Sequence, residues 1–481
     1  MGSTADALRA ELGGLLGVEH VLGAPPGSLY NFDASGRRSV EGRADAVVLP
    51  GSPQEVAAVV RWCYAHDIPI VARGGGTGVA GGAVATQGGV VCSLERLRAV
   101  RALQPELWRM EVEAGVSTRD VQRLARENGL MFAPDPGASE QSQIGGNVAT
   151  NAGGPHALKY GATGSWVMGL EAVIAPGEVV ALGGWARKDV AGYDLKALLI
   201  GSEGTLGVIT AVRLGLLPAP EDAIALMVFL RTREEGCAAM LDVLASGARP
   251  SALDFLDGAT LAIVAGGYPG SVPANAGFAL LIDVDGTRAE ASVQREELVQ
   301  LLSPSAVAIE QPADRGGLWR WRDGFNPVVA AVRGAKVSED IVFPPERLAE
   351  GLAGLERIGE RHGLRSCAWG HGGEGNVHAT VLVDPASERE VAAGEAAAED
   401  MFALVLSLGG SITGEHGVGW LKRGRLAEQW DSRAIELHEQ IKQAFDPKGL
   451  LNPGKKLARM PADGGRPAER QAANGPAAPA R

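Results

Sequence analysis

The chain has 481 residues, 46% of them hydrophobic, which allows about two or three domains with sizeable cores. Its formal net charge of -12 argues against nucleic acid or an anionic membrane surface as a partner. No apolar run reaches the roughly 20 residues of a membrane span. The N-terminus lacks the basic and apolar blocks of a signal peptide, so we expect a cytoplasmic protein.

The first part of the chain alternates short strands with helices. We expect a helical N-terminal extension over residues 1–41, with an amphipathic helix at 6–16. Ser52 suits the N-cap of the next helix, with Pro53 in its first turn, and Gly129 suits the end of a later one. The expected strands are 44–49, 68–72, 90–93 and 108–113, and the expected helices are 52–66 and 117–128.

A glycine-rich loop follows the strand at 68–72. It holds six glycines between Gly74 and Gly82, together with Arg73 and Thr77. Glycine allows positive φ and close backbone approach, and successive amides in such a turn form a concave anion site. Arg73 adds a fixed cation with a forked donor. The loop therefore predicts a clamp for a phosphate or pyrophosphate, and a merely flexible loop is the alternative.

Two familiar phosphate loops do not fit this clamp. A Walker A loop needs Gly-Lys-Ser/Thr at its end, which is missing. The pattern G-x-G-x-x-G is matched by Gly76, Gly78 and Gly81, but the true fingerprint opens a crossover helix. The stretch before the strand at 90–93 is short and glycine-rich, and a parallel crossover needs about a dozen residues. We therefore expect strand, clamp and strand, without a parallel crossover and without a nicotinamide fold.

Two more glycine-rich loops follow within the same part of the chain. Residues 132–155 are poor in expected regular structure and offer neutral hydrogen-bonding groups at Ser142, Asn147 and Asn151. A third glycine-rich turn at 200–210 enters a strand. Long loops inside a compact domain are usually functional. Three such loops suggest one long, extended ligand.

The composition shifts near residues 217–220. Strand-like segments at 223–230 and 277–284 alternate with helical segments at 233–245 and 288–302, which predicts a separate α+β domain. Residues 459–481 have low apolar content, and we expect a disordered tail.

Two glycine-rich bends in the second half carry imidazoles and a carboxylate. His371 and His378 flank the first bend, and Glu415 and His416 lie in the second. Two imidazoles and one carboxylate suit zinc or iron(II) with open positions, although satisfied core or loop histidines fit the spacing about as well. His416 is a candidate general base. The other histidines fit ordinary surface or helix positions: His20, His66, His156, His362 and His438.

Two cations lie upstream of these bends. Arg322 suits forked hydrogen bonding to a carboxylate, and Lys336 can assist it. Surface cations with apolar stems over Trp319 and Trp321 are an equally good interpretation. The four cysteines form no C-x-x-C pair, which argues against an iron–sulfur cluster or zinc ribbon and favours small buried side chains: Cys63, Cys92, Cys237 and Cys367.

Several of these motifs together resemble a known family. The chain is similar to the FAD-linked oxidases of the vanillyl-alcohol oxidase superfamily, in the group that contains the flavoprotein of glycolate oxidase, D-lactate dehydrogenase and D-2-hydroxyglutarate dehydrogenase. The resemblance covers about residues 45–455. The motifs are RGGGTG at 73–78, GGN at 145–147, GSEGTLG at 201–207, GHGGEGNVH at 370–378, GEHG at 414–417 and NPGK at 452–455.

The resemblance implies an α+β fold with an FAD-binding domain of two subdomains over 42–218. A ferredoxin-like cap domain for substrate and metal would span 222–457. FAD is expected to be non-covalent, because residues 74–78 contain no histidine. The implied FAD contacts are Arg73, Gly74, Gly75, Gly76, Thr77, Gly78, Gly81, Pro136, Gly137, Ser142, Gly145, Asn147, Asn151, Gly153, Gly154, Gly161, Glu203, Gly204, Gly207, Val208, Ile209 and Asn452.

The resemblance also implies a reaction. His371, His378 and Glu415 would bind a divalent metal, zinc being the usual one, and His416 would take the hydroxyl proton. The substrate would be a D-2-hydroxy acid of the lactate, glycolate or 2-hydroxyglutarate class, oxidised to the 2-oxo acid with hydride passing to flavin N5. Arg322 or Lys336 would anchor its carboxylate. Thr380 stands where the hydroxyglutarate enzymes have Asn, which leaves the distal group of the acid open.

Two alternatives stay open. One is an oxidase of an alcohol or sugar that uses oxygen, and the other is a flavoprotein subunit of a larger glycolate-oxidase-like complex. A separate acceptor is expected to take the electrons: an electron-transfer flavoprotein, an iron–sulfur subunit, a cytochrome or quinone. A homodimer is also compatible with the sequence.

Overall fold

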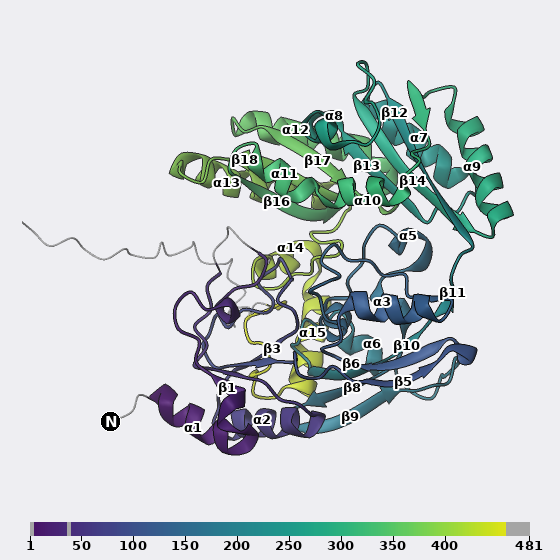
Figure 1. Cartoon of the computed structure of the whole chain (residues 1–481). Helices are drawn as coiled ribbons and strands as arrows, with labels where there is room; N and C mark the ends of the chain where they lie inside the picture. Colours follow the sequence, from purple (N-terminus) through teal and green to yellow (C-terminus); the bar gives the residue numbers. More distant parts are fainter. Residues whose placement is uncertain (1–3, 36–39, 458–481) are drawn as a thin grey trace, which may run out of the picture.

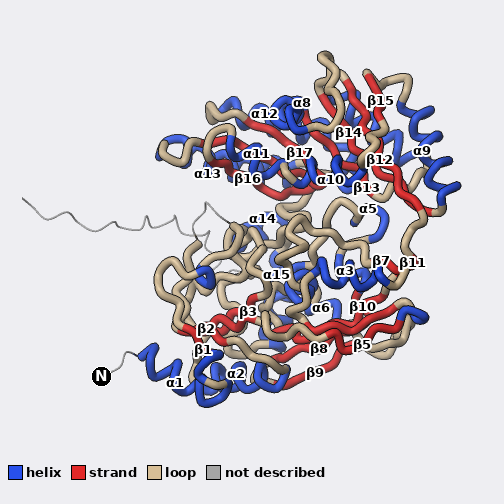
Figure 2. Tube along the Cα trace, in the orientation of Figure 1, coloured by secondary structure: helices blue, strands red, loops and turns tan. Residues whose placement is uncertain are grey.

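The computed structural model describes residues 4–35 and 40–457, and the expected tail at 459–481 lies outside the described residues. Two domains are stacked in Figure 1, and the last helices return from the upper domain into the lower one. Helices and strands occur in both domains (Figure 2), so the expected α+β class is confirmed.

A four-stranded sheet begins the lower domain. Three of its strands are parallel, which corrects the expectation at the clamp: β3 and β4 run parallel although no helix joins them. The connection at 74–89 is long enough to cross over as an irregular loop. The sheet is flanked by α1 (Thr4–Leu16) and α2 (Pro53–Ala65) and has the order β1 (Val21–Leu22), β2 (Ala46–Val48), β4 (Val90–Ser93) and β3 (Ile70–Arg73).

A five-stranded antiparallel sheet completes the lower domain. Its order is β5 (Val100–Gln104), β6 (Arg109–Glu113), β10 (Val208–Gly215), β8 (Val167–Ile174) and β9 (Glu178–Gly183). The Ser117 hydroxyl accepts from the Asp120 amide and caps α3 (Thr118–Glu127), close to the expected bounds. The long loop at 132–155 is more regular than expected, because it contains α4 (Ile144–Thr150). Short elements are β7 (Leu130–Met131), α5 (Ala157–Tyr160), α6 (Leu195–Leu199) and β11 (Leu217–Pro218).

The upper domain is built on a seven-stranded antiparallel sheet. Its first four strands follow the order β15-β12-β14-β13, and α7 and α9 connect them in the β-α-β-β-α-β pattern of the expected ferredoxin-like cap. Three further strands extend this sheet beyond β13. The strands are β12 (Asp222–Leu230), β13 (Ala252–Asp257), β14 (Phe278–Gly286), β15 (Ala308–Glu310), β16 (Ala335–Val342), β17 (Ser366–Gly370) and β18 (Asn376–Val383).

Helices pack on both faces of this sheet and bury its apolar side chains in two cores. One face carries α7 (Arg233–Ala245), α9 (Arg288–Leu302), α12 (Leu348–Arg361) and α13 (Glu388–Ser407). The other carries α8 (Gly258–Val264), α10 (Arg315–Asp323) and α11 (Phe325–Ala331).

The end of the described chain ties the domains together. After α14 (Leu426–Gln429), helix α15 (Ser432–Phe445) packs Ile441 and Phe445 on the core of the lower domain. Leu451 then lies parallel to Ile70 of β3. Since Leu426 of α14 still packs on the core of the upper domain, the chain passes between the domains in the stretch from α13 to α15, which includes the second histidine-bearing bend.

Candidate active site

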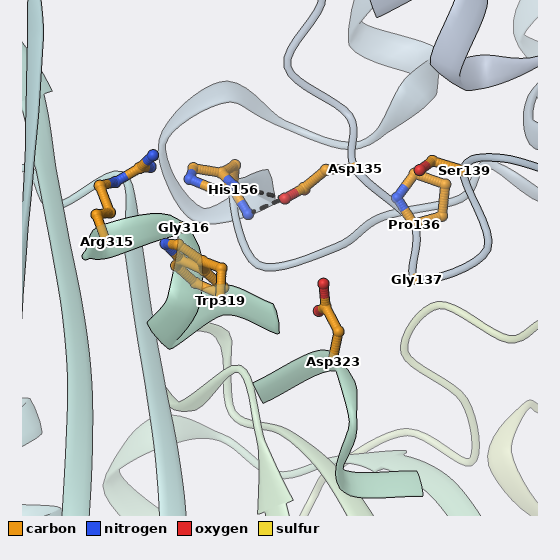
Figure 3. Close-up of a pocket in the computed structure, with 9 residues that line it drawn as sticks. All are labelled: Asp135, Pro136, Gly137, Ser139, His156, Arg315, Gly316, Trp319 and Asp323. Atoms are coloured by element: carbon orange, nitrogen blue, oxygen red, sulfur yellow. Dashed lines mark hydrogen bonds and ion pairs between the residues drawn. The ribbon is translucent and has the colours of Figure 1, made fainter. Parts of the chain in front are cut away.

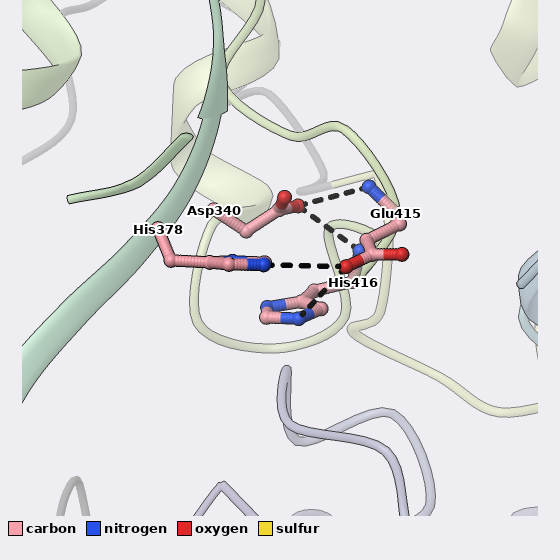
Figure 4. Close-up of side chains that lie close together, drawn as sticks. All are labelled: Asp340, His378, Glu415 and His416. Carbon is pink, nitrogen blue, oxygen red and sulfur yellow. Dashed lines mark hydrogen bonds and ion pairs between the residues drawn. The ribbon is translucent and has the colours of Figure 1, made fainter. Parts of the chain in front are cut away.

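Three imidazoles converge on one carboxylate oxygen at the domain boundary. The Nε2 atoms of His371, His378 and His416 lie 3.5, 3.6 and 3.8 Å from Oε1 of Glu415. The rings of His378 and His416 stack with centroids 5.4 Å apart. Figure 4 shows His378, His416 and Glu415 facing one another. The structure thus brings together the histidines and the carboxylate of the two glycine-rich bends.

The first bend owes its shape to one glycine. His371 follows β17 and His378 lies on β18, so the two strands present both imidazoles toward the second bend. Between them Gly375 has φ of +70°, and a side chain there would come within 1.9 Å of the carbonyl oxygen of Phe343. Only glycine fits this position.

Asp340 on β16 organises the second bend. Its Oδ2 accepts from the amides of Gly414, Glu415 and His416 at 2.8, 3.0 and 3.0 Å, and from the Thr413 hydroxyl at 2.8 Å. A ligand atom of Asp340 lies within 4.8 Å of those of His378, Glu415 and His416. Four donors already bond to that oxygen. We therefore interpret Asp340 as a residue that holds the bend in place and not as a ligand of a cation.

Asp254 on β13 holds His371 from behind. Its Oδ1 lies 2.8 Å from Nδ1 of His371, and its Oδ2 accepts from Nε of Arg322 at 2.6 Å. A carboxylate behind a histidine fixes which ring nitrogen faces a cation. The surface interpretation of Arg322 is wrong, since its side chain is 12% exposed and lies in this buried network.

The charges within the cluster are strongly coupled. Burial lowers the pKa of His371, but Asp254 and Glu415 outweigh burial and raise it to about 10. Burial raises the pKa of Glu415, but the imidazoles, His371 first, lower it to about 2. Burial lowers the pKa of His378 to about 3, against the attraction of Glu415. A metal ion would have to displace the proton of His371, because metals bind neutral imidazole.

Lys336 lies farther along the same sheet. Its ammonium donates to Oδ1 of Asn326 and lies 4.8 Å from the centre of the Trp369 ring. That ring in turn lies 5.8 Å from the ring of His378. The structure therefore separates Lys336 from the imidazole cluster by one aromatic side chain.

The clamp at 73–82 is organised by its own arginine. Nη1 of Arg73 donates to the carbonyl of Phe32 at 2.7 Å, and Nη2 donates to that of Leu29 at 3.1 Å. A side chain at Gly76 would come within 2.1 Å of the guanidinium, and one at Gly75 within 2.0 Å of the Gln141 carbonyl oxygen. The Arg73 side chain thus holds the loop from within, and the loop packs directly on the segment before α4.

Two of the glycine-rich loops and the segment at Asn452 leave unsatisfied polar atoms suited to a polar ligand. Oε1 of Gln143, Oγ of Ser202 and Oδ1 of Asn452 are buried without a hydrogen-bond partner among the described residues. Buried polar groups are normally paired, so such atoms call for a partner. A side chain at Gly78 would meet no described atom within 4 Å. Hydrogen-bonding groups and open backbone of this kind fit a dinucleotide such as FAD.

Several expected cofactor contacts have side chains that are already used within the protein. Oγ of Ser142 lies 2.7 Å from the Thr118 hydroxyl, to which the Asn147 amide also donates. Oδ1 of Asn151 accepts from the Gly164 amide at 2.8 Å, and the Glu203 carboxylate accepts from amides of the second bend. These hydrogen bonds engage side-chain atoms at positions that were expected to contact the cofactor.

The FAD-type loops and the imidazole cluster meet at one point. A side chain at Gly153 would come within 3.2 Å of Oε2 of Glu415. The neighbouring Gly154 has φ of +127° and leaves no room for a side chain beside Asp135. The loop of the lower domain therefore directly adjoins the metal-type cluster of the upper domain.

A polar cavity of about 260 Å³ lies between the domains near this point. Figure 3 shows His156 and Asp135 on one side, and Arg315, Trp319 and Asp323 of α10 opposite. The expectation that His156 is an ordinary surface residue is wrong, because its ring bridges two carboxylates. Nδ1 lies 2.6 Å from Asp135, and Nε2 lies 3.3 Å from Asp283 of the upper domain. Pro136 and Gly137 also line this cavity.

The fold and the site together define a flavin-type oxidoreductase, with nucleotide loops in one domain against an imidazole–carboxylate cluster in the other. Residues 44–183 match the FAD binding domain model, and residues 219–456 match the model for the C-terminal domain of FAD linked oxidases. The chain belongs to this family of FAD-linked oxidoreductases, which act on CH–OH groups, and FAD is its cofactor.

Named relatives span most of the chain. The glycolate oxidase subunit GlcD of Bacillus subtilis is 33% identical over 90% of this chain and 92% of its own length. A D-lactate dehydrogenase of Archaeoglobus fulgidus is 34% identical over 91% of this chain and 97% of its own length. The structure of p-cresol methylhydroxylase superposes with a TM-score of 0.79 at 18% identity, covering 95% of this chain and 98% of that one. The vanillyl-alcohol oxidase type of fold is thereby confirmed.

Across the described ranges, no helix combines the length and apolar character needed to span a membrane.

Proposed function

We propose that this protein oxidises a small D-2-hydroxy acid to the 2-oxo acid. The observation that carries the proposal is the close approach of Gly153 to Glu415, where a side chain at position 153 would come within 3.2 Å of Oε2. This approach puts a loop of the FAD domain against the imidazole cluster. A substrate between them would reach both. The relatives named as a glycolate oxidase component and as D-lactate dehydrogenase support a hydroxy acid as the substrate.

The cluster residues divide the work of substrate activation. His371, His378 and Glu415 would hold a divalent metal such as zinc, which lowers the pKa of a bound hydroxyl. His416, with a side chain 36% exposed, is the more accessible imidazole and takes the hydroxyl proton as general base. Arg322 offers its remaining N–H groups to the substrate carboxylate, with Lys336 assisting at longer range. FAD, when bound, supplies the hydride acceptor.

The cofactor would be held without a covalent bond by the three glycine-rich loops. Residues 73–78 would face the pyrophosphate, the loops at 134–154 and 201–210 the rest of the dinucleotide, and Asn452 the flavin edge. The orphaned Oδ1 of Asn452 supports the last assignment. The proposed domain bounds of 42–218 and 222–457 fit this division except at the end of the chain, because α15 and Asn452 lie against the FAD domain.

The test is a panel of D- and L-2-hydroxy acids with an artificial dye, before and after chelation. We expect reduction of the dye with D-lactate, D-glycerate, glycolate or D-2-hydroxyglutarate, loss of this activity with a chelator, and its return with zinc. No reduction by any acid of the panel, in protein that is loaded with flavin, would reject the proposal.

A second candidate is a flavoprotein subunit of a larger glycolate-oxidase-like assembly. The word subunit in the name of the GlcD relative favours it. Electrons would leave to an electron-transfer flavoprotein, an iron–sulfur subunit, a cytochrome or quinone in the cytoplasm, and the chain could form a homodimer. Dye reduction by the isolated chain would reject a purely non-catalytic subunit. Hydrogen peroxide formed under air from an alcohol or sugar would indicate an oxidase instead.

A further inference from the structure

The Glu203 carboxylate holds the chain immediately after the Glu415–His416 pair. Its Oε1 accepts from the Val418 amide at 3.0 Å, and its Oε2 accepts from the Gly419 amide at 2.6 Å. Glu203 belongs to the lower domain, in the turn before β10. One carboxylate of the FAD domain therefore binds two successive amides of the bend that carries the upper domain's catalytic groups.

The backbone of Glu203 is constrained to make this contact. Its φ is +57°, a left-handed conformation that costs a residue with a side chain about 1–2 kcal/mol. The surroundings enforce it: the Glu203 amide donates to the Ala149 carbonyl at 2.7 Å, and its carbonyl accepts from the Asn452 amide group at 2.7 Å. The side chain is buried as well, with the residue 8% exposed. Such a conformation persists only where surrounding contacts over-determine it.

Gly417 provides the room for this contact. It has φ of +79°, and a side chain at this position would come within 3.0 Å of Oε1 of Glu203. Since glycine tolerates both the conformation and the proximity, the carboxylate can approach the backbone from the side.

A second carboxylate holds the same bend from the other domain. Asp340 accepts from the amides of residues 414–416, and Glu203 accepts from those of 418 and 419. The bend is therefore fixed at both ends, once to the cap sheet and once to the FAD domain. Carboxylates that accept several amide bonds are strong anchors, because charge-assisted bonds are about twice as strong as neutral ones.

We propose that Glu203 is a positioning residue that sets Glu415 and His416 relative to the FAD domain. The inference rests on the proposed function, since it concerns the same cluster. It reassigns Glu203 from a cofactor contact to an anchor of the catalytic bend, because its carboxylate oxygens are directed at the amides of Val418 and Gly419. Removing its charge would let the bend move while the flavin loops stay in place.

The test is Glu203→Gln in the full-length protein loaded with FAD. Glutamine keeps one acceptor oxygen and turns an NH2 group toward the other amide. We expect kcat to fall about 10–100-fold, as for other residues that orient catalytic groups, with KM within about threefold and FAD content unchanged. Hydrogen exchange of the peptide around residues 412–422 should become faster. Glu171→Gln is the matched control, because Glu171 pairs with Arg101 on the five-stranded sheet, away from the bend.

The outcomes separate this inference from the proposed function. Exchange of the bend is measurable whether or not any hydroxy acid is oxidised, so unchanged exchange in Glu203→Gln overturns the positioning role by itself. Loss of FAD with a normally protected bend would likewise overturn it in favour of a cofactor contact. If Glu203→Gln does not fold, Gly417→Ala disturbs the same contact from the opposite side, with the same expected changes.

Discussion

Asp254 couples two side chains of the candidate active site. Its carboxylate is hydrogen-bonded to Nδ1 of His371 through one oxygen and to Nε of Arg322 through the other, and the residue is 1% exposed. Burial raises the pKa of Asp254, but Arg322 and His371 outweigh it and lower that pKa below its usual range. The carboxylate thus stays charged and keeps both partners oriented.

Asp254→Asn should weaken the cluster without touching the substrate directly. Asparagine has one acceptor oxygen in place of two, so it can accept a hydrogen bond from only one of the two partners. His371 therefore loses its fixed orientation. We expect zinc affinity and turnover to fall about 10–100-fold. Zinc titration of the FAD-loaded protein and dye reduction measure this. Asp242→Asn, on the exposed side of α7, should change neither, and equal zinc affinity in Asp254→Asn would contradict the role of Asp254.

His378→Ala should abolish turnover while leaving FAD bound. The imidazole lies 3.6 Å from Oε1 of Glu415, whereas the expected flavin loops belong to the other domain. Flavin absorbance after gel filtration and dye reduction by the hydroxy acid check both halves of the prediction. His66→Ala, which removes an imidazole that is 47% exposed, is the control. Release of flavin by His378→Ala would mean that the nucleotide and imidazole sites are not separate.

Part of this site can be predicted from the sequence. His371, His378, Glu415 and His416 share glycine-rich bends, a combination with few structural uses, and the structure brings them together. Asp254 was not predicted, because it lies 117 residues from His371 and an acidic residue in a strand has no distinctive local pattern. The bridging role of His156 has no local sequence pattern either, because its partners Asp135 and Asp283 lie far along the chain.

Among the elements, the capped helices were the most predictable. Ser52 accepts from the amide three residues on, as its position before Pro53 predicts, and Ser117, the first residue of the expected helix, does the same for α3. α4 was missed because its sequence begins Ile-Gly-Gly, and glycine is a poor helix former. The parallel pairing of β3 and β4 was missed because an irregular loop, rather than a helix, makes the crossover.

The clamp packs so closely on the segment before α4 that a larger residue at Gly75 should lower stability and FAD affinity. Gly75→Ala would put a methyl group 2.0 Å from the Gln141 carbonyl oxygen, so the two loops must separate. Overpacking of this kind costs about 1–3 kcal/mol. We expect a lower melting temperature and weaker FAD binding, measured by thermal melts with and without added FAD. Gly14→Ala, where an added methyl meets no described atom within 4 Å, is the control, and unchanged FAD affinity in Gly75→Ala would contradict the prediction.

The two domains meet through charged contacts that no local pattern predicts. His156 bridges Asp135 of the lower domain and Asp283 of the upper one, and Arg315 also pairs with Asp283. Close by, Lys159 pairs with Asp285. These contacts fix how the FAD loops face the imidazole cluster, so the stability of the domain interface and the geometry of the site are linked.

His156 makes that interface sensitive to pH. Burial lowers the pKa of His156, but Asp135 and Asp283 outweigh burial and raise it from 6.5 to about 10. A raised pKa in the folded state means that the stabilisation is complete below about pH 6.5 and is lost as the pH rises through about 10. Arg315 and Asp323 also face this cavity. Arg315 stays charged across this window and adds no pH dependence of its own, and burial raises the pKa of Asp323.

His156→Gln should therefore destabilise the protein most at low pH. Glutamine cannot carry the charge that both carboxylates attract, and hydrogen bonds to charged groups contribute roughly 1.5–3 kcal/mol. We expect a deficit of that order in the free energy of unfolding at pH 6.5, shrinking toward zero near pH 10, from urea denaturation of both proteins across this range. His362→Gln, which breaks a more exposed pair with Asp400, should show a smaller deficit. A deficit in His156→Gln that is constant with pH, or that grows as pH rises, would mean that the ring is neutral when it bridges the domains.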